Sequence, residues 1–93
     1  MVSTQAKLKY LKRREEELAT MEDLLTQGNF PEAASMLHKV KGSASTFGFD
    51  LLGTIAAGLE EECLNSKKTS SAEALHLFAS YRDNILGAIQ DLE

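Results

Sequence analysis

Apolar residues recur at steps of three and four along almost the whole 93-residue chain. This spacing places them on one face of an α-helix. The clearest run is the series Ala33, Leu37, Val40, Ala44 and Phe47. The chain contains only two valines, three isoleucines and one proline, which also favours helices over strands. The sequence therefore predicts an all-α protein.

Capping residues divide the first half of the chain into two helices. The first is predicted from about Ser3 to Gln27. Its apolar stripe is interrupted between Leu11 and Leu18 by "KRREEE", so we expect this helix to bend or split there. The second begins at "NFPE", where Asn29 can cap it, and stops at Gly48.

The second half contains two more helices. Asp50 is predicted to cap the third, and "NSKK" at 65–68 closes it. Ser70 and Glu73 form a capping-box pattern at the start of the fourth. Because the connections are short, neighbouring helices should be antiparallel. We expect residues 1–93 to form one domain, an up-down-up-down antiparallel four-helix bundle.

Composition and charge exclude several classes of protein. The net charge of −4 argues against a general role in coating nucleic acid. No apolar run approaches the roughly 20 residues that span a bilayer, and "MVSTQAKLKY" lacks the apolar core of a signal peptide. The single cysteine, Cys63, rules out an internal disulfide and a zinc-binding cysteine cluster. We expect a cytoplasmic protein with no metal of its own and no nucleic-acid or membrane partner.

One basic segment is an alternative starting point for function. "KLKYLKRR" at residues 7–14 could contact nucleic acid or a membrane surface. Three glutamates follow it at once, so a solvated helix face with paired charges explains the segment better.

The second helix places a histidine where a partner could reach it. Ala34, His38, Gly42 and Ser45 share one line along the helix, just outside the core stripe. Glycine in a helix costs roughly 1 kcal/mol relative to alanine, so Gly42 needs a reason. Small neighbours leave the imidazole open to a second protein. Lys41, one turn away, can neutralise an anion added to the ring.

Small residues also gather on the third helix, in "GTIAAG" at 53–58. We expect Ala34, Ser45, Gly53 and Ala57 to line a docking surface that joins the second and third helices. Ala56 is better explained by packing inside the bundle. The second histidine, His76, fits a solvated helical position with no metal-binding partners in the sequence.

The segment "HKVKGSAS" resembles the H-x-x-K-G-[SA]-[SA] signature of histidine-containing phosphotransfer (HPt) domains. The similarity extends to "TQGNFPEAASML" before it and to "FGFDLL" and "GLEEEC" after it, and covers about 24–63. The fourth helix agrees in length and pattern. The run "STFGF" is also partly similar to the phosphotransfer domain of chemotaxis histidine kinases.

The resemblance implies roles for four residues. His38 matches the histidine that accepts phosphate on its outer ring nitrogen, and Lys41 the lysine near the phosphoryl oxygens. Gly42 matches the glycine that gives the partner clearance. Glu60 matches the position that holds the inner ring nitrogen. The alternative for Glu60 is an ordinary charged helix face, since it begins the run "EEE" at 60–62.

The function that the resemblance implies is a phosphorelay module without kinase activity. It would exchange a phosphoryl group between His38 and an aspartate of response-regulator receiver domains, downstream of a sensor histidine kinase. Magnesium is expected on the receiver and no cofactor on this chain. One histidine per bundle makes a monomer sufficient. The alternative is a helical module that binds receivers without carrying phosphate.

Overall fold

The computed structural model describes residues 2–65 and 69–93, and these residues contain helices and no strand. The all-α prediction is confirmed. The elements are α1 (Thr4–Glu16), α2 (Leu18–Thr26), α3 (Phe30–Ala44), the short 3-10 helix η1 (Ser45–Phe47), α4 (Asp50–Leu64) and α5 (Ser71–Leu92).

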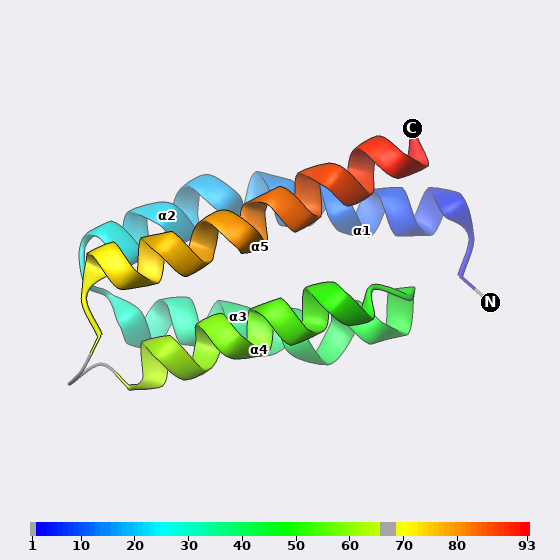
Figure 1. The fold of residues 1–93 in the computed structure, drawn as a ribbon. Coiled ribbons are helices and arrows are strands. Elements are labelled where there is room, and N and C mark those ends of the chain that lie inside the picture. The colour runs from blue at the N-terminus through cyan, green and yellow to red at the C-terminus, as the bar shows by residue number, and fades with distance from the viewer. Residues whose placement is uncertain (1, 66–68) are drawn as a thin grey trace.

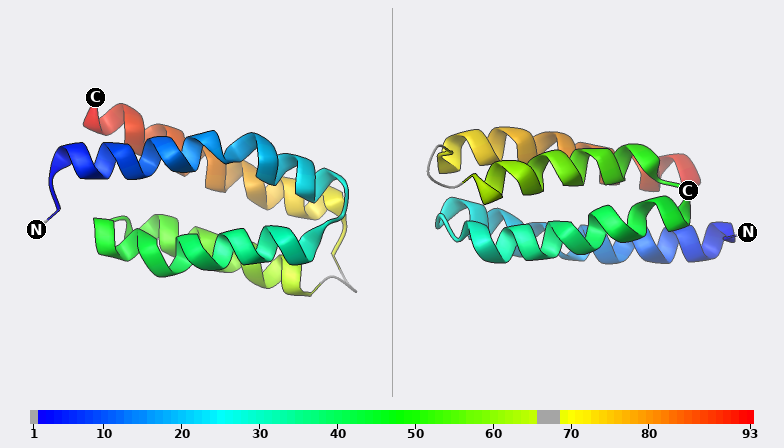
Figure 2. Two further views of the ribbon diagram at one scale, coloured as in Figure 1. Left: turned by 180° about the vertical axis from the view of Figure 1, so that it is seen from behind. Right: turned by 90° about the horizontal axis from the view of Figure 1, so that it is seen from below.

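The helices form four rods that lie along one long axis (Figure 1). α1 and α2 follow one another as a single bent rod, α3 and α4 lie side by side, and α5 returns along α1 and α2. Successive rods run in opposite directions along the long axis, as both further views also show (Figure 2). The resulting shape is elongated, with extents of 41 × 19 × 16 Å. The outer faces of α3 and α4, which point away from the other rods, are therefore open to solvent or to a partner.

The first rod breaks at Glu17, inside the segment where the sequence predicts a bend. α1 ends at Glu16 because the Glu17 N–H bonds to the Arg14 carbonyl, 3.2 Å away, in a tightened last turn. The Arg14 Nε lies 3.0 Å from the Glu17 carboxylate, and the Arg14 guanidinium lies 4.8 Å from the centre of the Tyr10 ring. These contacts fix the break without a glycine or a proline.

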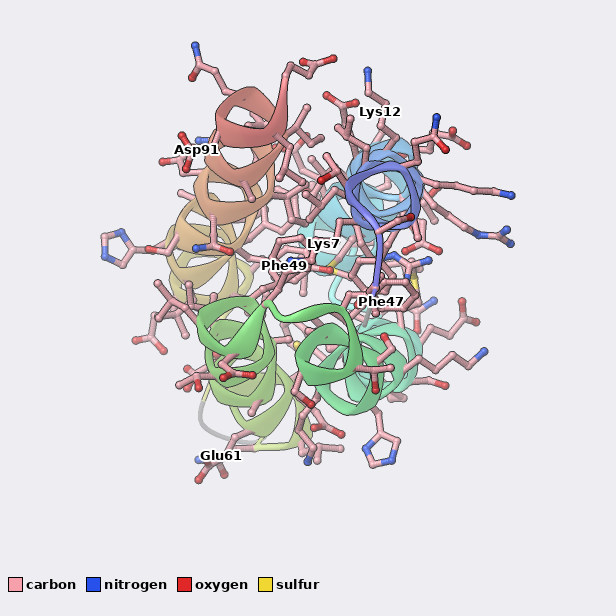
Figure 3. All side chains as sticks on the ribbon, turned by 90° about the vertical axis from the view of Figure 1, so that its right-hand side faces the viewer. Lys7, Lys12, Phe47, Phe49, Glu61 and Asp91 are labelled. Atoms are coloured by element: carbon pink, nitrogen blue, oxygen red, sulfur yellow. The ribbon has the colours of Figure 1, made fainter. Side chains whose placement is uncertain are left out.

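The core combines one apolar stripe from each rod, as periodicity predicts. Tyr10 joins it unexpectedly: its ring stacks on Phe47 with centroids 4.3 Å apart, and Phe49 lies 6.2 Å away. Figure 3, seen along the bundle, shows Phe47 and Phe49 between the rods at this end. The buried stripe positions are Leu11, Met21, Leu25, Ala33, Leu37, Val40, Ala44, Leu52, Leu59, Cys63, Ala74, Phe78, Tyr81, Ile85 and Ile89. The partly buried residues that pack against them include Leu8, Leu18, Phe47, Ile55, Ala88 and Leu92.

The predicted helix starts agree with the structure to within a residue, but the second helix ends earlier than predicted, since α3 stops at Ala44 and η1 carries the chain to Gly48. Not every predicted cap forms. The Ser70 Oγ accepts the Glu73 N–H at 3.2 Å, so this half of the capping box is present. Asn29 stands at the start of α3 but its side chain makes no capping bond. Asp50 lies in the first turn of α4 rather than at its cap. The predicted stop "NSKK" lies outside the described residues from position 66 onward.

Two further expectations concern Cys63 and the membrane. Burial raises the pKa of the Cys63 thiol to about 11, with the nearby Glu62 and Glu60 charges adding to the shift. The thiol is therefore protonated at neutral pH and acts as a small core side chain.

In the described part of the chain, no helix combines the length and apolar character needed to cross a bilayer.

Candidate functional site

His38 stands on the outer side of α3, about midway along the bundle. Its neighbour Leu37 is fully buried, whereas the His38 side chain is 68% exposed. One step along a helix turns the side chain by about 100°, which is enough to move it from the core to the surface. The core stripe of α3 thus fixes the outward direction of the imidazole.

The inner side of the imidazole is held by a carboxylate from the neighbouring helix. The His38 Nδ1 lies 2.9 Å from the Oε2 of Glu60, which belongs to α4. The other oxygen of the same carboxylate, Oε1, lies 3.1 Å from the Lys41 Nζ. Glu60 therefore bridges two residues that are one turn apart on α3, and each of its oxygens has one partner.

Glu60 is the one buried charged residue in the described part of the chain, with 8% of its surface exposed. Desolvation by this burial acts to raise the pKa of the Glu60 carboxyl. The hydrogen bonds from Lys41 and His38, together with their positive charges, outweigh it, so the pKa lies below its ordinary value. The carboxylate is thus ionised at neutral pH and can only accept hydrogen bonds.

An ionised Glu60 determines which nitrogen of His38 carries the proton in the neutral ring. Because the carboxylate can only accept, Nδ1 must donate, and the lone pair lies on Nε2. Among the described residues no hydrogen bond to Nε2 is formed, and the His38 side chain as a whole is 68% exposed. The site therefore presents an oriented nucleophilic nitrogen to solvent, with a carboxylate behind it to stabilise positive charge on the imidazole.

The surface on one side of His38 is open and built from small residues. A Cβ atom added to Gly42 would have no other atom within 4 Å, apart from its own helix and chain neighbours. Gly42 and Ser45 are exposed, and Ala57 on α4 is partly exposed. Another protein could approach the α3 backbone closely at this point.

Two residues expected in the docking surface are buried instead. Gly53 is buried where α4 packs on α3, and a Cβ there would lie 3.6 Å from both the Ala44 Cβ and the Lys41 carbonyl oxygen. Contrary to expectation, its small size serves the packing of these helices. Ala34 is 4% exposed, but it lines the floor of a shallow hollow that also includes His38 and Glu60.

Two features close to this site are not predicted by the sequence. Leu64 is 67% exposed at the rim of the hollow beside His38. On the other side of α3, the Tyr10 hydroxyl lies 2.7 Å from the Ser43 Oγ and ties α1 to the end of α3. Ser43 lies in the segment "HKVKGSAS", but its contact with Tyr10 and the exposure of Leu64 follow only from the packing of the rods.

The other histidine lacks such an arrangement. His76 is exposed on α5 in a hollow shared with Glu62 and Glu73, and no hydrogen bond to it is formed among the described residues. Within residues 2–65 and 69–93, no group of three or more histidine, cysteine or acidic side chains could hold a metal ion.

The helical fold and the exposed, carboxylate-bound histidine together define a class of small helical modules that carry one oriented imidazole. The sequence model of the Hpt domain matches residues 8–92, and the chain belongs to this family. Hpt domains are phosphocarrier modules that perform histidine phosphotransfer in phosphorelays, where they interact with receiver domains and kinases. Comparison with curated proteins and with solved structures gave no match.

Proposed function

We propose that the Nε2 of His38 accepts a phosphoryl group from an aspartyl phosphate of a receiver domain and can return it. The observation that carries the proposal is the exposed imidazole whose Nδ1 is bound to the buried carboxylate of Glu60, 2.9 Å away. The ring is free on one side and oriented from the other. This is what a transient phosphate carrier requires.

The transfer balances in bonds and charge. The Nε2 lone pair attacks phosphorus, an N–P bond forms, and the bond from phosphorus to the aspartate oxygen breaks. The aspartate leaves as a carboxylate with the electron pair. The imidazole becomes positively charged and keeps its Nδ1 proton, which donates to Glu60. The reverse reaction follows the same path, since a carboxylate on the receiver attacks phosphorus and Nε2 leaves.

Charge neutralisation during transfer is divided between this chain and its partner. Phosphoryl transfer passes through a loose transition state, so position and charge matter most. Lys41 supplies one ammonium group next to the site, 45% exposed and able to reach phosphoryl oxygens. The remaining positive charge would be a magnesium ion held by the aspartates of the receiver.

The receiver would dock on α3 and α4 over the open positions Gly42, Ser45 and Ala57. Close approach is necessary because the transferred phosphorus lies between Nε2 and the aspartate oxygen. A sensor histidine kinase would supply the phosphate upstream. A monomeric antiparallel bundle in the cytoplasm is sufficient for this role, since each chain carries one oriented histidine.

The two histidines of the chain allow a matched test. We expect incubation with a phosphorylated receiver domain to leave an acid-labile, alkali-stable phosphate on the wild-type chain. His38→Gln should reduce the label to background, and His76→Gln should keep it at the wild-type level. Labelling that persists in His38→Gln would contradict the proposal. Receiver binding without any label would favour a module that binds and does not carry phosphate.

A further inference from the structure

A second hollow lies on the opposite side of α3 from α4. Residues from the end of α1, from the break at Glu17 and from the middle of α3 line it, and its volume is about 230 Å³. Met36 is half-buried and Val40 is buried, so the α3 part of its wall is partly apolar. The rest of the lining is Arg13, Arg14, Glu17 and Lys39.

The cationic residues of this hollow differ in how their charge is balanced. The Arg14 side chain is 13% exposed and paired with the Glu17 carboxylate, which neutralises its charge. Arg13 and Lys39 are exposed, and in the described part of the chain no carboxylate oxygen lies within 4.0 Å of either. A chain with a net charge of −4 thus keeps two unbalanced positive charges at the rim of one hollow.

This hollow and the hollow beside His38 share one lining residue. Lys39 lines both this hollow and the hollow that contains His38 and Glu60. A protein seated over His38 therefore reaches Lys39, and then Arg13, by extending across α3 toward α1. We call the surface formed by Arg13 and Lys39 the basic rim.

We propose that the receiver domain that docks on His38 places an acidic surface segment against the basic rim. The inference rests on the proposed function and adds the direction in which the interface extends, across α3 onto α1. Complementary charges beside the reacting group raise the association rate and favour one partner over another. The hollow between the two cations accommodates a side chain, which a flat surface would not.

Charge reversal tests the basic rim. The variant Arg13→Glu/Lys39→Glu is compared with Lys12→Glu/Arg82→Glu, which changes the net charge by the same amount. Lys12 and Arg82 are paired with Glu93 and Asp83, and Lys12 lies on the side of α1 away from α3 (Figure 3). The ligand is the receiver domain of the source organism that binds the wild-type chain most tightly, and circular dichroism verifies the fold of each variant.

The rim variant should weaken receiver binding by about tenfold or more at roughly 50 mM salt, and the difference should shrink at about 500 mM. The control variant should remain within about twofold of the wild-type chain. Equal weakening in both variants, or none in the rim variant, overturns the proposal. Binding of a DNA duplex that the rim variant loses, with receiver binding intact, also overturns it.

Labelling by phosphoramidate, a small phosphoryl donor, separates this inference from the proposed function. The rim variant should still be labelled on His38, because labelling by phosphoramidate involves no partner surface. In another outcome, the wild-type chain takes no label from either donor while the rim variant still binds the receiver more weakly than the wild-type chain does. In that outcome the basic rim is supported and the carrier function is contradicted.

Discussion

The two histidines of this chain occupy similar surfaces and differ in what lies behind them. Both are exposed on long helices, and both have glutamates nearby. Behind His38 stands a carboxylate that is buried, ionised and bound to Nδ1, whereas His76 shares a hollow with two glutamates and forms no hydrogen bond among the described residues. Exposure makes an imidazole reachable, but only a fixed acceptor orients it.

The largest effect should come from removing the fixed acceptor. Glu60→Ala deletes the carboxylate that orients His38 and holds Lys41, and labelling by phosphoramidate should fall about 100-fold. Glu60→Gln keeps a hydrogen-bond acceptor for Nδ1 but loses the charge, so labelling should fall about tenfold. Glu73→Ala, beside His76, should label like the wild-type chain. Equal rates in Glu60→Ala and Glu73→Ala would show that orientation of His38 is unimportant.

A smaller effect should follow from closing the space beside His38. Gly42→Gln should slow phosphoryl transfer from a receiver about tenfold, because the added side chain keeps the receiver from the α3 backbone. Phosphoramidate labelling should not change, because a small donor needs no clearance. The added side chain meets open space, so helix stability should rise by about 0.5–1 kcal/mol, measured by urea denaturation.

Gly87 provides the control for this substitution. It lies within α5, and an added Cβ there also has no contact within 4 Å. Gly87→Gln should stabilise the protein similarly and leave receiver transfer at the wild-type rate. If both glutamine variants transfer normally, clearance at Gly42 is not needed.

The smallest effect is a pH dependence of stability that comes from Glu60. Its pKa in the folded protein lies below the value in the unfolded chain. The ionised carboxylate therefore contributes stability that is fully present above the unfolded pKa, about 4.3. This contribution is lost as the pH falls through the folded pKa.

Urea denaturation of the wild-type chain and Glu60→Gln measures this contribution. The difference in unfolding free energy should be constant near neutral pH and shrink below about pH 4. Glu61→Gln, an exposed position on the same helix, corrects for the loss of one carboxylate. A difference that grows as the pH falls would reverse the assigned role of Glu60.

The sequence was sufficient for those features that depend on local spacing. The stripe of α3 determined both its buried face and the outward position of His38, because each follows from the turn per residue. The break near Glu17 followed from the charged interruption of the first stripe. Family resemblance supplied Glu60 as a partner of the imidazole, and the structure brings the two together at 2.9 Å.

Features that depend on contacts between distant segments were not predictable. Tyr10 and Ser43 are separated by 33 positions, and their hydrogen bond joins α1 to α3 across the bundle. Gly53 belongs to a segment of small residues that was expected to form an open surface, but it is buried because α4 packs closely on α3. The Lys41 to Glu60 contact also requires the register between these two helices, which no pattern within one helix encodes.

The sharing of one carboxylate between His38 and Lys41 has a consequence for how this site can evolve. Since each oxygen of Glu60 serves one partner, a change at any of the three positions alters the environment of the other two. Their mutational effects should be epistatic, so that the penalty of Lys41→Ala is smaller in a Glu60→Ala background than in the wild-type chain. Drift at these positions in diverging copies of the gene should therefore be correlated.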